Sequence, residues 1–135
     1  MKELKMLIDS NQYYAFIPQV FSQIDGVCFD FTKKKFFIKN RKTYLPEVTQ
    51  ELEKSSGSFV ELYLSPIRNQ TPIMAREDDL ENFPCRLNRH EIMHGINVTY
   101  GSRLNCLKVL SLLKYVSDLL VHIDEKGELQ TKKHN

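Results

Sequence analysis

The sequence predicts an all-α or mainly α fold. Three stretches carry this prediction: an N-terminal stretch over residues 2–24, a short capped stretch over 86–94, and a long leucine-rich stretch over 102–123. In the first and the last, apolar residues recur at intervals of three and four, which places them on one face of an α-helix. A chain of 135 residues can bury a core of its own. We therefore expect a single helical domain over residues 1–127 and a disordered polar tail over 128–135.

The N-terminal stretch combines a helical stripe with two signals that interrupt it. Pro18 lacks a backbone donor, so we expect either a kink there or a break near Asn11 that divides the segment in two. Gly26 lies close to the expected end of the helix. The stripe itself consists of Tyr13, Phe16, Ile17, Val20 and Ile24.

The middle of the chain carries weaker signals. Phe29 and Phe31 alternate with polar residues, which indicates a short β-hairpin near residues 29–38, with a continued helix as the alternative. Pro46 is expected to start another helix that ends at the serine- and glycine-rich residues 55–58. Pro66 should stop a brief apolar run over 59–64, and residues 65–83 should form mostly a long surface loop.

Capping signals define the two last helices. Asn88 with Glu91 three residues later resembles a capping box, and Gly95 is a typical C-terminal stop, so a short helix is expected over 86–94. Ser102 is the expected N-cap of the long helix. That helix has two adjacent apolar stripes, which indicates a helix that is central in the core or shared with a second subunit. The stripes are Val109, Leu112, Val116, Leu119 and Ile123, and Leu104, Leu107, Leu110 and Leu113.

Composition narrows the class of protein. The three cysteines form no CxxC pattern, so they predict neither a disulfide framework nor a cysteine-based zinc site, and they favour a cytoplasmic protein. No window of eighteen apolar residues is present, so we expect no membrane partner.

The net charge of +2 is small, but the charges are unevenly distributed. Aromatic residues interleave with a basic block over residues 33–42, which is one pattern of an RNA-backbone track with stacking rings. The more common interpretation is a solvated lysine face over buried aromatic rings. The basic block comprises Lys33, Lys34, Lys35, Lys39, Arg41 and Lys42, and an acidic block comprises Glu77, Asp78, Asp79 and Glu81.

The segment from Asn88 to Gly101 has the residues that suggest chemistry. One interpretation is metallic: His90-Glu91-x-x-His94 is formally the HExxH pattern, in which two histidines share a zinc ion and the glutamate is the general base. A catalytic zinc needs a third protein ligand. In the extended form of the pattern, Tyr100 stands where the third histidine should be, so this interpretation ranks last.

A second interpretation comes from a resemblance. Arg89 and His94, with the polar His90 directly after the arginine, match the Arg-x4-His motif of the HEPN superfamily. The surrounding Asn-Arg-His-x-Ile-x-His-Gly, the Tyr100-Gly101 pair and the leucine-rich closing helix resemble a pattern in uncharacterised bacterial HEPN-like proteins. The detailed resemblance covers residues 87–122, and a weaker one covers residues 13–26.

The resemblance implies a helical bundle that forms a homodimer, with the motif at the dimer interface. It also implies a metal-independent endoribonuclease or an RNA-binding protein of a toxin or phage-defence type. No cofactor is expected, and an antitoxin or another protein is a candidate partner.

The chemistry of RNA cleavage fits a composite site. Cleavage by the substrate's own 2′-hydroxyl needs a base and an acid, and an imidazole can do either near neutral pH. One chain offers one convincing catalytic histidine, His94, so a two-fold dimer would bring the second. Arg89 would supply a fixed charge and a donor fork for the phosphorane oxygens.

Four further residues are candidates for supporting roles. Asn88 or His90 would hold the arginine or the backbone in place, and Tyr100 and Arg103 would stack or contact phosphate.

Two alternatives remain beside this assignment. One is a non-catalytic helical dimerisation or interaction module. In the other, the segment is purely structural: Asn88 caps a helix, Arg89 pairs with Glu91 or the acidic block, and His94 closes the helix where its charge suits the dipole.

Overall fold

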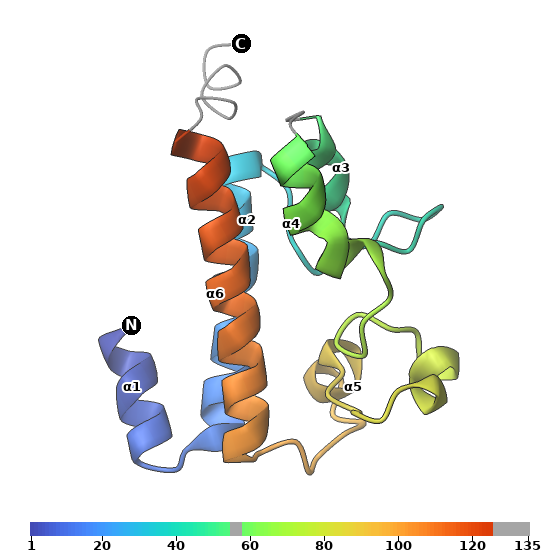
Figure 1. Cartoon of the computed structure of the whole chain (residues 1–135). Helices are drawn as coiled ribbons and strands as arrows, with labels where there is room; N and C mark the ends of the chain where they lie inside the picture. The colour runs from blue at the N-terminus through green and yellow to red at the C-terminus, as the bar shows by residue number, and fades with distance from the viewer. Residues whose placement is uncertain (55–57, 126–135) are drawn as a thin grey trace. The chain divides into compact units, whose positions relative to one another are not determined.

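The chain is mainly helical, as the sequence predicts. The computed structural model describes residues 1–54 and 58–125, and within these ranges no β-strand forms (Figure 1). No helix in these ranges is long and apolar enough to cross a membrane. The helices are α1 (Lys2–Asp9), α2 (Tyr13–Thr32), α3 (Glu47–Glu53), α4 (Ser58–Arg68), the 3-10 helix η1 (Glu77–Asn82), α5 (Arg89–Met93) and α6 (Arg103–Glu125).

The chain divides into two compact units. Unit 1 comprises residues 1–23 and 71–113, and unit 2 comprises residues 24–70 and 114–135. Each is described by itself below. The expected tail over 128–135 lies outside the described residues.

In unit 1 the N-terminal segment is broken where the sequence predicts. The first helix, α1, ends at Asp9, and Asn11 adopts a left-handed conformation with φ of 58° before α2 begins at Tyr13 (Figure 1). Asparagine tolerates this conformation better than other residues with a side chain. Phe16, Ile17 and Val20 then form the predicted stripe and are buried.

In unit 2 the second helix continues beyond the expected end. It passes Gly26 and ends at Thr32, so the helix end expected near Gly26 and the β-hairpin expected near residues 29–38 are both wrong. The reason is packing, because Ile24 and Cys28 are buried one helical turn apart. This burial outweighs the roughly 1 kcal/mol by which glycine disfavours a helix. The continued helix, the alternative at this position, holds for residues 29–32.

Proline has opposite effects at two places in unit 2. Pro46 precedes α3 as its N-cap residue, as predicted. Pro66, by contrast, lies inside α4 and does not stop it at residue 64. Pro66 removes the helical hydrogen bond to the carbonyl oxygen of Leu62, and burial of Leu64 and Ile67 on either side outweighs this loss.

The rest of unit 2 is held by packing and by a few polar contacts. Arg68 pairs with Glu53 at 3.1 Å and with Glu61 at 3.5 Å. The Tyr115 hydroxyl donates to the carbonyl oxygen of Tyr63. The apolar side chains at the core are Val48, Leu52, Leu64, Ile67, Val116, Leu119, Leu120 and Ile123.

Alanine substitutions at two glycines test the course of α2 and the turn that follows α5. Gly26→Ala should raise the free energy of unfolding by about 0.5–1 kcal/mol, because Gly26 is inside α2 and a Cβ atom there meets nothing within 4 Å. Gly95→Ala should lower it by about 1 kcal/mol, since Gly95 has a φ of 71°. Urea denaturation followed by circular dichroism measures both. A destabilised Gly26→Ala protein would mean that α2 does not run through this position.

Candidate functional site

Asn88 is a buried residue that fixes the start of α5. Its side-chain oxygen accepts a hydrogen bond from the backbone N–H of Glu91 at 3.1 Å, which confirms the predicted cap. Its amide nitrogen donates to the carbonyl oxygens of Pro72 and Ala75, at 2.8 and 2.9 Å. The backbone N–H of Arg89 also donates to Ile73. The first residue of α5 is therefore tied to the segment over residues 72–75.

The end of α5 is equally well defined. The N–H of Gly95 donates to the carbonyl oxygen of Ile92, and the N–H of Ile96 donates to that of Glu91. With the positive φ of Gly95 this is a Schellman motif, so the predicted stop is confirmed. The helix covers residues 89–93 and is shorter than the expected 86–94, because Asn88 itself is the extended N-cap residue.

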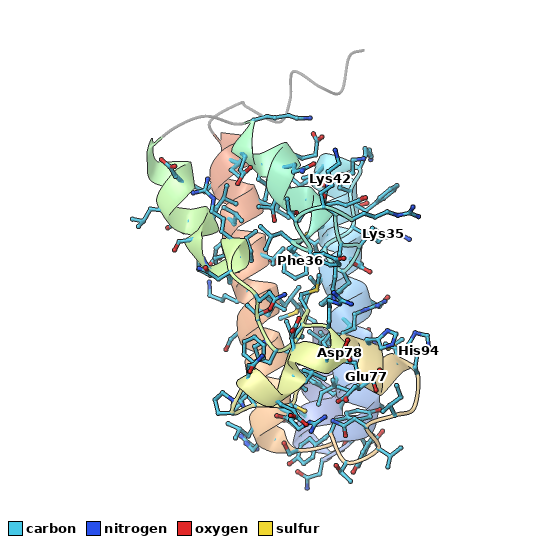
Figure 2. The ribbon with its side chains drawn as sticks, turned by 90° about the vertical axis from the view of Figure 1, so that its right-hand side faces the viewer. Lys35, Phe36, Lys42, Glu77, Asp78 and His94 are labelled. Carbon is cyan, nitrogen blue, oxygen red and sulfur yellow. The ribbon has the colours of Figure 1, made fainter. Side chains whose placement is uncertain are left out.

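The structure brings His90 and His94 together. Their ring centroids are 4.4 Å apart with an interplanar angle of 48°, and both side chains are exposed. Figure 2 shows His94 projecting from the surface of the ribbon. At neutral pH an imidazole offers one nitrogen as a donor and the other as an acceptor, so two adjacent rings form a small polar surface that can take part in proton transfer.

Arg89 lies on an adjoining face of the same helix. With 3.6 residues per turn, its side chain leaves the helix about 100° from that of His90. The residue is half-buried and its Nε atom is buried. Burial of this stem restricts the directions that the guanidinium group can take, which is useful in a residue that must meet a phosphate in a fixed geometry.

Glu91 has a structural environment and does not face the histidine pair as a free base. Its side chain is 5% exposed, and its carboxylate pairs with Arg86 at 3.3 Å. In residues 1–54 and 58–125, no three or more His, Cys, Asp or Glu side chains form a group that could hold a metal ion. For the zinc interpretation, His90 and His94 are adjacent as that site requires. Its expected general base, Glu91, is instead paired with Arg86.

Tyr100 and Gly101 join the segment before α6 to α2. The Tyr100 hydroxyl donates to the carbonyl oxygen of Tyr14 at 3.1 Å, and the two rings meet edge to face at 5.0 Å. A Cβ atom at Gly101 would collide with the Tyr14 ring, so a larger residue there would require this ring to move. Burial, and then the neighbouring Tyr14, raise the pKa of Tyr100 above its ordinary value. Tyr100 is therefore a neutral donor that contacts α2.

The sixth predicted residue, Arg103, is exposed at the first position of α6. The preceding Ser102 accepts from the N–H of Asn105 at 3.1 Å, which confirms the predicted N-cap. The predicted site residues all lie in unit 1, but only the two histidines contact one another through their rings. These residues are Asn88, Arg89, His90, His94, Tyr100 and Arg103.

Three exposed apolar side chains close to the histidines in the sequence, here called the apolar cluster, were not part of the sequence prediction. Met93, Ile96 and Val98 have exposed fractions of 49, 52 and 67%. They follow one another in α5 and in the segment after it, on both sides of His94 in the sequence. Several exposed apolar side chains within a few residues of one another are a candidate contact surface. Their signal in the sequence was weak, because each also fits an ordinary helix or loop.

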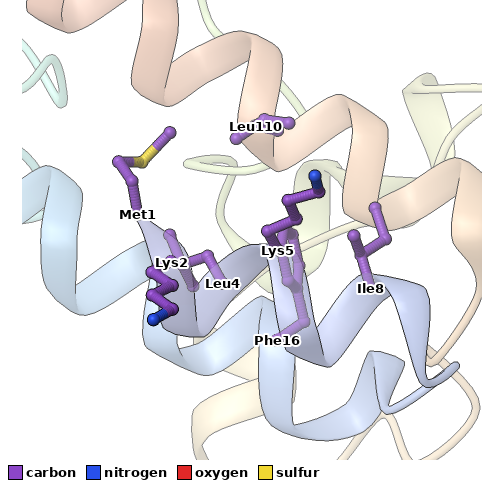
Figure 3. Close-up of a pocket in the computed structure, with 7 residues that line it drawn as sticks. All are labelled: Met1, Lys2, Leu4, Lys5, Ile8, Phe16 and Leu110. Atoms are coloured by element: carbon purple, nitrogen blue, oxygen red, sulfur yellow. The ribbon is translucent and has the colours of Figure 1, made fainter.

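A cavity of about 430 Å³ lies elsewhere in unit 1 (Figure 3). It is lined mostly by hydrocarbon, from Met1, Leu4 and Ile8 of α1 and its start, Phe16 of α2 and Leu110 of α6, with Lys2 and Lys5 also at its lining. None of the predicted site residues takes part. The cavity is therefore separate from the histidine pair.

Comparison with protein-family models, with curated proteins and with solved structures finds no match to this chain. The HEPN resemblance thus stays a prediction from the sequence.

The position of α5 should depend on Asn88. Asn88→Ala removes the cap, which contributes about 1 kcal/mol, and leaves two carbonyl oxygens without their donor. We expect the free energy of unfolding to fall by about 2–4 kcal/mol in urea denaturation. Ser102→Ala is the matched control, because it removes a cap and nothing else, and should lose only about 1 kcal/mol. Equal losses in the two variants would contradict the role assigned to Asn88.

Proposed function

We propose that this chain is a metal-independent endoribonuclease or RNA-binding protein of HEPN-like type, in the toxin or phage-defence setting that the resemblance implies. Arg89 and His94 are its principal site residues, in a homodimer. The observation that supports this best is the exposed pair of imidazoles, His90 and His94, at the end of a helix that begins with Arg89.

The geometry of the pair favours a site shared by two copies. In cleavage by the 2′-hydroxyl, the attacking and leaving oxygens lie roughly in line on opposite sides of the phosphorus, so the base and the acid must approach from opposite sides. The rings of His90 and His94 are in contact and reach the same side. The second proton-transfer group then has to come from an equivalent pair in a second copy.

The roles follow from the positions. His94 transfers a proton, and His90 is a positioning residue that packs against its ring. Arg89 stabilises the charge on the phosphorane oxygens through its donor fork. Asn88 fixes the helix that carries all three. Tyr100 is bound to α2, and Arg103 is the exposed cation that remains for phosphate contact.

The apolar cluster Met93, Ile96 and Val98 is the surface on which the second copy would dock. A two-fold contact uses the same patch on both partners. Because these residues flank His94, such a contact brings the two histidine pairs near each other.

The same cluster also favours a second candidate function. A non-catalytic interaction module, which binds a second copy or another protein such as an antitoxin, needs the apolar surface but not the histidines. Catalysis distinguishes the two candidates.

Cleavage of a long unstructured RNA should depend on His94 and Arg89 and should persist in EDTA. His94→Ala should lower the rate by at least about 10²–10⁴-fold, the value for one proton-transfer group, because both copies of the homodimer lose His94. Arg89→Lys should also be severely impaired, since an ammonium group keeps the charge but not the bidentate fork. Arg76→Lys, at an exposed arginine of the same unit, is the control and should remain active.

Circular dichroism should show that each variant stays folded. A His94→Ala protein that cleaves as fast as the wild type would refute the assignment. If the wild type itself cleaves no RNA, the interaction module is the better account.

The docking surface makes a separate prediction. Val98→Lys should convert a dimer into a monomer in analytical ultracentrifugation and should reduce cleavage in parallel, because the composite site is lost. Leu62→Lys introduces the same charge at a side chain that is 70% exposed in unit 2, and it should change neither property. A wild-type protein that sediments as a monomer at micromolar concentration would contradict the shared site.

A further inference from the structure

The loop between α2 and α3 in unit 2 concentrates positive charge. Within residues 33–42 six side chains are cationic, and residues 33–46 contain no carboxylate. In the described part of the chain, no ion pair involves Lys35, Arg41 or Lys42. The charges of these three side chains are therefore not used in ion pairs within the fold, and they can meet an anionic partner.

Two buried phenylalanines anchor the loop. Phe36 and Phe37 are 2 and 7% exposed and pack edge to face at 5.1 Å. The backbone N–H of Phe37 donates to the Asp25 carboxylate in α2 at 2.9 Å. The sequence analysis named a solvated lysine face over buried aromatic rings as the more common interpretation of this block. The burial of Phe36 and Phe37 confirms it for these two rings. Figure 2 shows Phe36 turned toward the helices and Lys35 and Lys42 at the surface.

The second half of the loop is a tight turn of defined shape. The N–H of Asn40 donates to the carbonyl oxygen of Leu45 at 2.8 Å, and the N–H of Tyr44 donates to that of Asn40 at 2.9 Å. The Asn40 side chain accepts from the N–H groups of Lys42 and Thr43. Arg41 and Lys42 are therefore presented at the tip of a closed turn and are partly preorganised for a ligand.

The turn also presents an aromatic ring. Tyr44 is 43% exposed and follows the two cations within three residues. Phe29, which is 44% exposed near the end of α2, lies 5.3 Å from the Lys33 ammonium group. Cations that track a phosphate backbone, together with a ring on which a base can stack, are the features of single-strand binding surfaces.

We infer that the loop over residues 33–44 binds single-stranded RNA, with Lys35, Arg41 and Lys42 on the phosphates and Tyr44 under a base. The choice of RNA rests on the proposed function, whereas the backbone contact rests on the loop itself. The loop then supplies affinity at a place other than the histidine pair.

Binding can be measured on the whole wild-type chain with a fluorescent 2′-O-methyl oligonucleotide of about 12 nucleotides, which spans the usual footprint of single-strand binding proteins. The methyl group removes the attacking hydroxyl, so the probe is not cleaved. With the three phosphate contacts of Lys35, Arg41 and Lys42, the affinity measured by anisotropy should fall about 20-fold between 50 and 200 mM salt.

The double variant Lys35→Ala/Lys42→Ala should bind more weakly, and its affinity should fall only about 3-fold over the same range, because two of the three contacts are lost. Lys2→Ala/Lys5→Ala removes the same charge from α1 and should keep the wild-type salt dependence. A loop variant with the wild-type salt dependence would overturn the inference. So would equal effects of the two double variants, which would mean that only the total charge matters.

Substitutions of Tyr44 measure the contribution of base stacking to binding separately from that of charge. Tyr44→Ala should weaken single-strand binding by about 5- to 150-fold, and Tyr44→Phe should leave it unchanged. Binding to a duplex of the same length should not respond, since its base faces are covered. An unaffected Tyr44→Ala protein would refute the stacking role, and binding to anionic lipid vesicles without binding to the oligonucleotide would refute the assignment to RNA.

The experiments can refute the RNA-binding loop and the proposed active site independently of each other. If loop variants lose binding while cleavage proves independent of His94, the loop assignment stands and the proposed active site is wrong. If cleavage needs His94 but the loop variants bind normally, the reverse holds.

Discussion

The site depends on the side chain of one buried amide. Asn88 satisfies three backbone groups at once, an N–H of α5 and the carbonyl oxygens of Pro72 and Ala75. A helix of five residues is too short to be stable by itself, so its position comes from such contacts. Because Asn88 joins α5 to a segment without regular structure, the direction of Arg89 and His94 is set by hydrogen bonds more than by packing of the helix itself.

Local signals explain the parts of the fold that could be predicted from the sequence. The break at Asn11 and the caps at Asn88, Gly95 and Ser102 depend on residues that are at most a few positions apart. Their physical cause, a left-handed backbone or an unpaired N–H, is therefore visible in a short window. The exposed pair of histidines follows from the same rule, since residues four apart share a helix face.

Contacts between distant residues explain what could not be predicted. The alternation at Phe29 and Phe31 indicated a strand, but burial of the preceding Cys28 extends α2 through it. The Tyr14 ring occupies the space that a side chain at position 101 would need, and these residues are 87 positions apart, so this reason for the Tyr100-Gly101 pair is not visible in the sequence. The turn that the sequence placed at 29–38 occurs later, at residues 39–46, where Asn40 closes it.

The short segment over residues 88–94 contains both buried and exposed side chains. Variants at the two kinds of position have to be interpreted differently. Asn88, Glu91 and Ile92 are buried and have partners within unit 1, whereas His90 and His94 are exposed. A variant at a buried position changes the helix and moves every side chain on it, so a loss of activity there reports on folding. A variant at His94 leaves these contacts in place. Only the exposed positions can therefore connect a loss of activity with chemistry, and Arg89, half-buried at the start of the helix, requires the conservative change to lysine for the same reason.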